Sequence, residues 1–109
     1  MLKGTIILND QECEGSIDFR NTEKYMTKGF KSKFGDEAEE LFSQSIDMIM
    51  EKYPNNADYF QVLCYEDIKY YLIVDDYGNG RYILTALLPE EYWERTNIPL
   101  WRKVVAYGN

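Results

Sequence analysis

The chain of 109 residues contains no histidine, and this absence excludes several kinds of chemistry. Histidine is the side chain that most often acts as a general base near neutral pH, and it is also the commonest metal ligand. Without it, the chain has no Ser-His or Cys-His nucleophile pair of its own. The composition therefore favours a protein that is not an enzyme and that has no catalytic residues, no metal site and no cofactor.

Cysteine is also scarce, with Cys13 and Cys64 as the two thiols. Their spacing does not match a metal-binding motif. Two buried thiols in a reducing compartment are the simpler interpretation, although the sequence leaves a disulfide open. The start of the chain lacks an apolar run of signal-peptide length, and no window approaches the length of a membrane span. We expect a cytoplasmic protein.

Basic side chains are outnumbered, with 12 Lys and Arg against 19 Asp and Glu and a formal net charge of −7. Phosphate backbones and anionic lipids repel such a chain, so direct binding to nucleic acid or to a membrane is not expected. The charge instead favours a partner protein with a basic surface. It does not indicate an oligomeric state.

Motifs that bind phosphate or carry catalysis are missing as well. Gly78-Asn79-Gly80 lacks the third glycine and the following helix of a dinucleotide-binding fingerprint, and it fits a tight hairpin turn. The neighbouring carboxylates at positions 75–76 and 90–91 do not by themselves form an acid–base dyad or a metal cage. Turn and cap chemistry explains them at least as well.

Strand-forming residues are abundant between Asp58 and Leu88. Residues 58–65, 68–74 and 81–88 are rich in β-branched and aromatic side chains and are separated by polar turns, which predicts a three-stranded antiparallel meander. Weaker patterns predict a hairpin of residues 5–8 and 13–19, a short strand at residues 25–30 and a closing strand at residues 101–107. The rest of residues 20–34 has the composition of a loop, and Pro89 fits the first position of a short helical turn.

One long helix is predicted between Asp36 and Tyr53. Apolar side chains recur there at the i, i+3, i+4 and i+7 spacing of one buried face, and Asp36 with Glu39 has the spacing of a capping box. The fold class is therefore a single α+β domain, residues 1–109. We expect an antiparallel sheet of about five to six strands with one long amphipathic helix packed on a face.

The predicted outer face of this helix is acidic, and two interpretations remain open. It is either solvated surface or a stripe that docks on a basic groove of a partner. For the second interpretation the candidate partner-binding carboxylates are those of Glu37, Glu40, Asp47 and Glu51. Tyr59, Tyr65 and Tyr71 can lie on one face of the sheet, and tyrosines supply rigid contact area with a polar tip.

Two classes of function follow from these features. The first is a small acidic, non-enzymatic interaction protein that acts as a stoichiometric inhibitor of the phage anti-defence or toxin-immunity type. It would block a basic surface of a partner protein, for example one that binds nucleic acid. The alternative is a protein that binds a small anionic ligand, or a minor enzyme. It would use a tyrosine-lined sheet face, with the basic residues 24–33 as an anion clamp.

Three segments together resemble the domain-of-unknown-function family 960, short proteins of Gram-positive bacteria and their mobile elements. They are Tyr25-Met26-Thr27-Lys28-Gly29-Phe30, Asp58-Tyr59-Phe60-Gln61-Val62 and Pro89-Glu90-Glu91-Tyr92. The resemblance covers roughly residues 25–92 and rests on an aromatic-x-Thr-basic-Gly start, an Asp-Tyr-x-Gln-Val strand and a Pro-Glu-Tyr-like exit. It implies an α+β fold and no activity.

Overall fold

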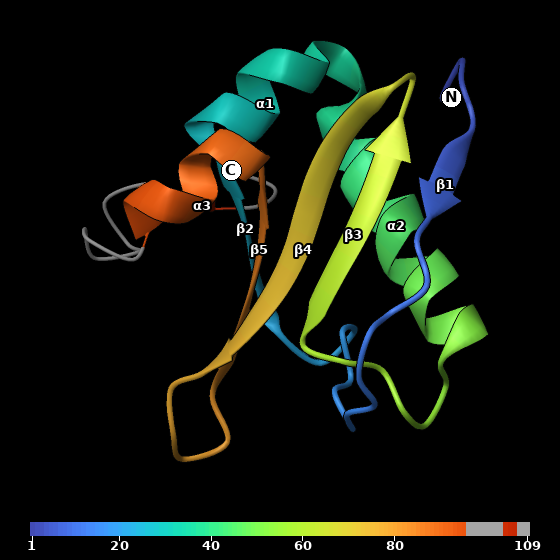
Figure 1. Ribbon diagram of the computed structural model, residues 1–109. Helices are drawn as coiled ribbons and strands as arrows, with labels where there is room; N and C mark the ends of the chain where they lie inside the picture. Colours follow the sequence, from blue (N-terminus) through green and yellow to red (C-terminus); the bar gives the residue numbers. More distant parts are fainter. Residues whose placement is uncertain (96–103, 107–109) are drawn as a thin grey trace.

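The three apolar runs between Asp58 and Leu88 form the antiparallel meander that their composition predicts. In the computed structural model, which describes residues 1–95 and 104–106, these runs are β3 (Phe60–Tyr65), β4 (Ile68–Asp76) and β5 (Tyr82–Leu87) (Figure 1). Glu66 and Asp67 connect β3 to β4, and both have a positive φ, which is typical of a two-residue hairpin turn of the primed type.

Three further strands extend the meander at its two sides. β1 (Ile6–Leu8) pairs with β3 at one edge, β2 (Glu23–Thr27) pairs with β5, and β6 (Val104–Ala106) pairs with β2 at the other edge. The strand order within the described residues is β1-β3-β4-β5-β2-β6. The sheet is mostly antiparallel, as predicted, but β2 runs parallel to β5.

One face of the sheet is covered by a continuous helical segment. It consists of α1 (Lys28–Phe34), a 3-10 turn at Gly35–Glu37 and α2 (Ala38–Lys52) (Figure 1). The periodic face predicted for the long helix is buried in the core. The buried side chains of α2 are Ala38, Leu41, Phe42, Ser45, Ile46, Ile49 and Met50. Together these elements form the compact single α+β domain that the sequence predicts.

The helical segment begins earlier than predicted. The short strand predicted at residues 25–30 is β2, which ends at Thr27, and residues 28–34, predicted as the end of that strand and a loop, form α1. Thr27 caps α1, because its Oγ1 accepts a hydrogen bond from the backbone N–H of Phe30. Phe30 and Phe34, one helical turn apart, are both buried. The predicted capping box at Asp36 does not form. Asp36 lies inside the 3-10 turn, and Glu37, which precedes α2, makes no side-chain cap hydrogen bond.

The predicted hairpin of residues 5–8 and 13–19 is also wrong. β1 exists, but it pairs with β3, and residues 13–19 form no strand. The segment instead binds the connection between α2 and β3. Gly15 N–H donates to Asn56 O at 3.2 Å, and Ile17 N–H donates to Ala57 O at 3.0 Å. Phe19 at the end of this segment is fully buried, whereas Cys13 at its start is exposed.

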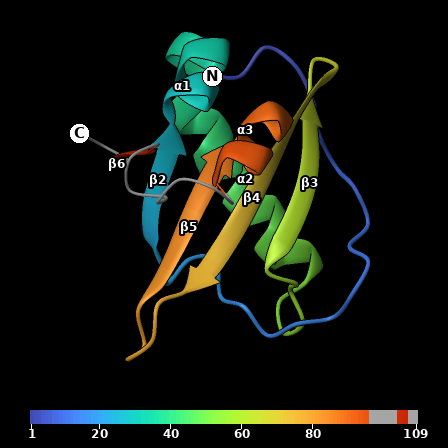
Figure 2. The same cartoon turned by 60° about the vertical axis from the view of Figure 1, so that its left-hand side comes forward.

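The opposite face of the sheet carries α3 (Pro89–Arg95), the short helix predicted after Pro89 (Figure 2). Of the closing strand predicted over residues 101–107, the described part is β6, and its other residues lie outside the described part of the chain. Among the described residues, no helix combines the length and the apolar composition that a membrane span requires.

Candidate binding site on the outer face of the sheet

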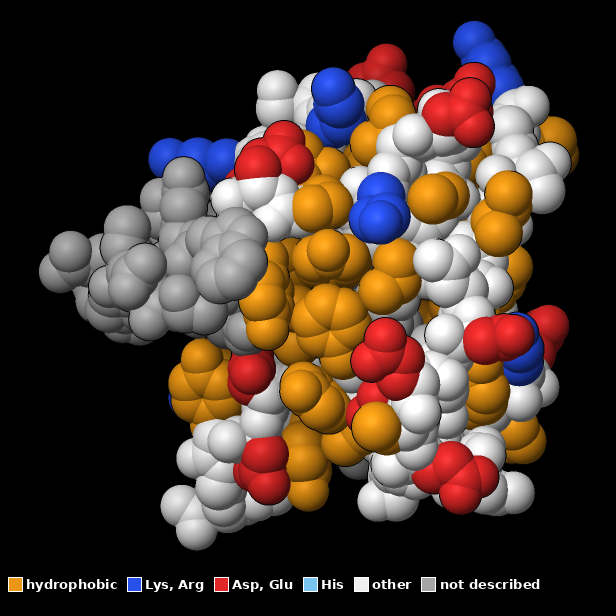
Figure 3. All heavy atoms as spheres, viewed as in Figure 1, with side chains coloured by type: hydrophobic (Ala, Val, Ile, Leu, Met, Phe, Trp, Pro, Cys, Tyr) orange, Lys and Arg blue, Asp and Glu red, His pale blue; other side chains and the backbone are white. Residues whose placement is uncertain are grey.

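Alternation along β3 and β4 divides their side chains between the two faces of the sheet. Leu63 and Tyr70 are paired across the strands and turn toward α1 and α2, where both are fully buried. The opposite face, which we call the outer face, carries Phe60, Val62 and Tyr71, and all three are half-buried. Figure 3 shows apolar side chains gathered over β3 and β4 on this face, with acidic and basic side chains around and among them.

An aromatic cluster lies on the outer face, with Phe60 at its centre. The ring centroid of Phe60 is 4.9 Å from that of Tyr71, 5.6 Å from that of Tyr92 and 6.3 Å from that of Tyr59. Tyr59 and Tyr92 contact Phe60 in T-shaped geometry, an arrangement that aromatic quadrupoles favour. Tyr59 remains 53% exposed, so one end of the cluster is open to solvent.

Tyr92 reaches this cluster because Glu91 fixes α3. The Glu91 carboxylate accepts hydrogen bonds from Thr27 Oγ1 at 2.5 Å, from Leu88 N–H at 2.9 Å and from Gly29 N–H at 3.1 Å. These donors belong to the ends of β2 and β5 and to the first turn of α1. One carboxylate thus joins α3 to both layers of the fold.

Gln11 fixes the chain that follows β1 beside the start of β3. Its Oε1 accepts from Asp58 N–H at 2.8 Å and from Gln61 Nε2 at 2.9 Å, and its Nε2 donates to Asn56 O at 2.9 Å. Gln61 is itself buried, which makes this anchor part of the core. The residues around Gln11 therefore form a defined wall next to the outer face.

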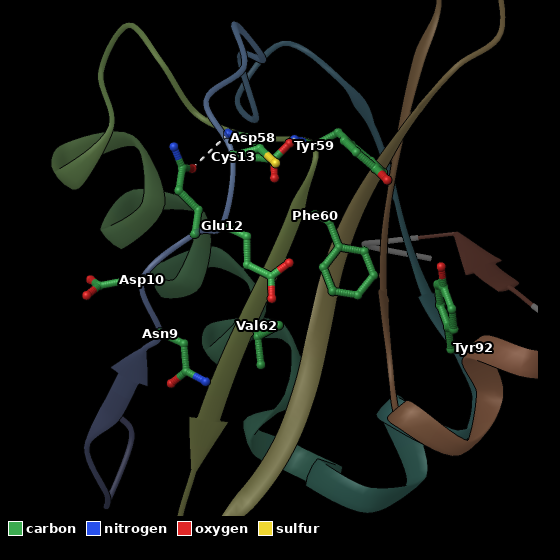
Figure 4. Close-up of a pocket in the computed structure, with 10 residues that line it drawn as sticks. Asn9, Asp10, Glu12, Cys13, Asp58, Tyr59, Phe60, Val62 and Tyr92 are labelled. Atoms are coloured by element: carbon green, nitrogen blue, oxygen red, sulfur yellow. Dashed lines mark hydrogen bonds between the residues drawn. The ribbon is translucent and has the colours of Figure 1, made fainter.

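A trough of about 430 Å³ lies between this wall and the aromatic cluster. It is lined by residues 9–13, residues 58–60, Val62 and Tyr92 (Figure 4). Figure 4 shows the Glu12 side chain reaching across the trough toward β3, whereas Asp10 points away from it. The trough therefore combines an apolar, aromatic floor with one carboxylate directed over it.

The part of the chain that the structure describes lines the trough with acidic side chains and with no basic one. Asp10 accepts a hydrogen bond from Lys52 Nζ at 2.6 Å, and this bond lowers the pKa of Asp10. Asp58 Oδ1 accepts from Tyr59 N–H at 2.8 Å. Glu12, in contrast, is exposed and has no hydrogen-bond or ion-pair partner within the described part of the chain. Its charge is available to a ligand.

The four predicted carboxylates of the helix, which we call the helix stripe, differ in how free they are. Glu40 pairs with the amino terminus at 2.9 Å, and Asp47 pairs with Arg20 at 3.1 Å. Glu37 accepts a hydrogen bond from the Tyr65 hydroxyl at 2.7 Å, which is the main reason that the pKa of Glu37 is lowered. Glu51 is exposed. The stripe is thus partly neutralised by contacts within the protein.

The three predicted tyrosines do not share one face. Tyr59 and Tyr71 belong to the aromatic cluster on the outer face. Tyr65 is 1% exposed and turns toward the helices, where its hydroxyl accepts from the backbone N–H groups of Lys3 and Gly4. Burial, and then the bond to Glu37, raise the pKa of Tyr65. Tyr65 is therefore a core residue and is not available to a partner.

The structure also separates the other groups that the sequence analysis combined. The helix stripe lies on the helical layer, and Tyr59 and Tyr71 lie on the opposite side of the sheet. The basic stretch is separated from these tyrosines as well. Lys24 Nζ donates to the backbone carbonyls of Arg20 and Thr22, and α1, which carries Lys31 and Lys33, packs on the helical layer. Neither predicted combination forms a single surface.

Sequence reasoning did not identify Gln11, Glu12 or Tyr92 as parts of a site. Residues 9–12 read as turn residues, and nothing in the sequence brings them to β3, because their contacts cross more than 40 positions of the chain. Both cysteines are free thiols, as predicted, but the prediction that both are buried is wrong, because Cys13 is exposed and Cys64 is partly exposed. In the described residues, no group of three or more Cys, Asp and Glu side chains is arranged to hold a metal ion.

Comparison of the chain with protein-family models, with curated proteins and with solved structures gives no match. The resemblance to the domain-of-unknown-function family 960 therefore stays a prediction.

Proposed function

We propose that the protein is a non-enzymatic interaction protein that binds a basic surface of a partner protein through its outer face. The observation that carries this proposal is the trough, where the Glu12 carboxylate, unpaired among the described residues, reaches toward β3 and the half-buried rings of Phe60 and Tyr92 form part of the same lining. Clustered aromatic anchors with a charged rim are the usual composition of a protein-binding hot spot.

The overall charge of the protein also favours a basic partner. A net charge of −7 attracts a basic partner over a distance of about one Debye length and raises the rate of association. A specific interface needs about 800 Å² on each partner, so the trough would be the anchor within a larger contact. The neighbouring exposed side chains Ile7 and Tyr59 extend the apolar surface around it.

The helix stripe is a less favourable binding surface for a partner than the outer face. Glu37, Glu40 and Asp47 already have partners within the protein, and a new partner would have to replace those contacts. The apolar anchors also lie on the other side of the sheet. For the small-anion alternative, the described residues that line the trough include carboxylates and no lysine, and this lining disfavours an anionic ligand.

Occupation of a basic surface would make the protein a stoichiometric inhibitor. If the partner uses that surface to bind nucleic acid, the acidic protein competes with phosphate groups for the same lysines and arginines. Small size and acidity are shared with phage anti-defence and toxin-immunity proteins, which is an argument by association. The inhibitor class is thus the form of interaction protein that we propose.

Affinity capture tests the proposal. The immobilised protein is exposed to lysate of its host at low salt and eluted at about 0.5 M salt, where the Debye length falls to roughly 4–5 Å. We expect one partner that is captured by the wild type and by Glu51→Lys, lost by Glu12→Lys, and released by salt. A partner that is lost by Glu51→Lys and kept by Glu12→Lys would transfer the site to the helix stripe and contradict the proposal.

A further inference from the structure

We infer that the trough is a subsite for the guanidinium group of an arginine side chain on the partner protein. This inference rests on the proposed function and names the group that the outer face recognises. It follows from the joint position of a carboxylate and an aromatic ring on the two sides of one cavity.

The two sides of the trough provide different contacts. Phe60 and Tyr92 supply apolar ring surface on the side of the sheet, and the Glu12 carboxylate reaches toward β3 from the opposite wall, on the Phe60 side of this surface (Figure 4). A planar cation placed between them can stack on a ring and pair with the carboxylate at the same time. Cations are attracted to aromatic faces within about 6 Å of the ring centroid.

The charges around the trough agree with a cation. Among the described residues, no lysine or arginine lines it, so no described side chain within it would repel a guanidinium. Lys52 neutralises Asp10, but Asp10 points away from the cavity. Glu12 keeps an unpaired carboxylate in the described structure, so its pairing with a ligand breaks no existing contact there. An anion, in contrast, would face this carboxylate without any compensating charge.

Arginine fits this arrangement better than lysine. Its guanidinium group is planar, stacks on aromatic rings, and presents parallel N–H groups that match the two oxygens of a carboxylate. The ammonium group of lysine is a compact, strongly hydrated charge that gains less from stacking. The trough volume of about 430 Å³ leaves room for a side chain together with adjoining backbone.

Short peptides test the subsite without knowledge of the partner. The full-length, ¹⁵N-labelled protein is titrated with acetyl-Gly-Arg-Gly-amide and with the same peptide containing citrulline, the neutral isostere of arginine. The backbone signals of Phe60 and Val62 report binding at the trough. We expect the arginine peptide to bind about tenfold more tightly than the citrulline peptide, since one charged pair and one cation–π contact are lost with the charge.

Two matched variants assign the effect to Glu12. Glu12→Gln removes one charge over the trough, and Glu51→Gln removes one charge on α2. We expect Glu12→Gln to abolish the preference for arginine over citrulline and Glu51→Gln to keep it. Equal affinities of the two peptides for the wild type, signal changes confined to α2, or equal effects of the two variants would each overturn the subsite.

The failure of the subsite can be distinguished from the failure of the proposed function. If the peptides do not bind at the trough but Glu12→Lys still prevents partner capture, the outer face is an interface without an arginine subsite. If Glu12→Lys also leaves partner capture unchanged, both the subsite and the proposed function are wrong. Unchanged melting temperatures of the two glutamine variants exclude misfolding as the cause.

Discussion

Glu91 fills the space that a side chain at position 29 would need. A Cβ atom added to Gly29 would lie 2.5 Å from Oε2 of Glu91, closer than real Cβ atoms approach other atoms. The same carboxylate accepts the backbone N–H of Gly29 and the hydroxyl of Thr27. The first turn of α1 and the first turn of α3 are thus fitted to each other, and this contact sets the position of Tyr92.

This contact predicts that Gly29→Ala lowers the free energy of unfolding when residue 91 is glutamate and does not lower it when residue 91 is alanine. Alanine normally stabilises a helix by about 1 kcal/mol relative to glycine. In the wild type, however, the added methyl group displaces the carboxylate from its donors, so we expect a net loss of about 1–2 kcal/mol. In a Glu91→Ala background the same substitution should be neutral or stabilising. Urea unfolding of the wild type, of each single variant and of the double variant measures the effect of Gly29→Ala in both backgrounds.

Ser32→Ala is the control for this cycle. Ser32 is exposed on the same helix, so its substitution should have the same small effect in both backgrounds. Equal effects of Gly29→Ala with and without Glu91 would show that the two residues do not interact.

The hydroxyl of Thr27 makes two hydrogen bonds, and one pair of variants distinguishes their contribution to stability from that of the side chain's shape. Its Oγ1 accepts from Phe30 N–H as the cap of α1 and donates to Glu91. Thr27→Val keeps the shape but loses both bonds, and we expect a loss of about 2–3 kcal/mol in the free energy of unfolding. Thr27→Ser keeps the hydroxyl and should lose less than about 1 kcal/mol. Similar losses for the two variants, measured by urea unfolding, would contradict these roles.

Tyr70 predicts a loss of stability at alkaline pH. Its hydroxyl contacts Ser45 Oγ at 2.6 Å, and Ser45 donates to Leu41 O, so the tyrosine is the donor to the serine. Burial raises the pKa of Tyr70 above its ordinary value of 10. The stability that depends on the neutral phenol is therefore complete below pH 10 and declines as the pH rises from 10 toward the folded-state pKa.

Comparison with Tyr70→Phe isolates this effect. The free energy of unfolding of the wild type should fall above pH 10 with a contribution of up to about 1.4 kcal/mol per pH unit from this proton, and the variant should lack it. At pH 7 the variant should lose about 1 kcal/mol with the hydrogen bond. Tyr77→Phe, at a tyrosine that is 50% exposed, should leave the pH profile unchanged. The measurement is urea unfolding between pH 7 and pH 11.5.

The hydrogen bond between Glu37 and Tyr65 predicts a loss of stability at acidic pH. The Tyr65 hydroxyl lowers the pKa of Glu37 below its usual 4.5, so the stabilisation is present above pH 4.5 and is lost as the pH falls through the folded-state pKa. In Tyr65→Phe the pKa of Glu37, followed by NMR of the side-chain carboxyl carbon, should rise toward 4.5. An unchanged pKa of Glu37 would show that the hydroxyl does not stabilise its charge.

Local patterns in the sequence were sufficient for the parts of the fold that depend on near neighbours. The meander follows from alternation and turn residues, and the buried face of α2 follows from its helical period. The parallel pairing of β2 with β5 could not be predicted in the same way, because it joins Glu23 to Ile83 across the helical segment and the meander. Residues 13–19 were misassigned as a strand because their backbone partners lie at Asn56 and Ala57.

The candidate site was harder to predict than the fold. The sequence predicts that Tyr59 and Tyr71 are rigid aromatic anchors. The register of β3 and β4 places Tyr71 beside Val62 on the outer face, and alternation along β3 places Tyr65 on the other face. Tyr59 precedes β3 and joins the cluster through its contact with Phe60. The sequence instead predicted the acidic helix face as a binding surface, because its carboxylates are close together in the sequence. Glu12 lies in a short polar turn, and its importance depends on the Gln11 anchor, which only the folded chain brings to Asp58 and Gln61.

The most direct test of the outer face as the binding surface is site-specific photo-cross-linking to the captured partner. A photoreactive phenylalanine derivative is introduced either at Tyr59, which is 53% exposed beside the trough, or at Ser43, which is exposed on α2. The binding surface proposed here predicts a covalent complex from position 59 and none from position 43. A complex formed from position 43 but not from position 59 would place the partner on the helix stripe and contradict it.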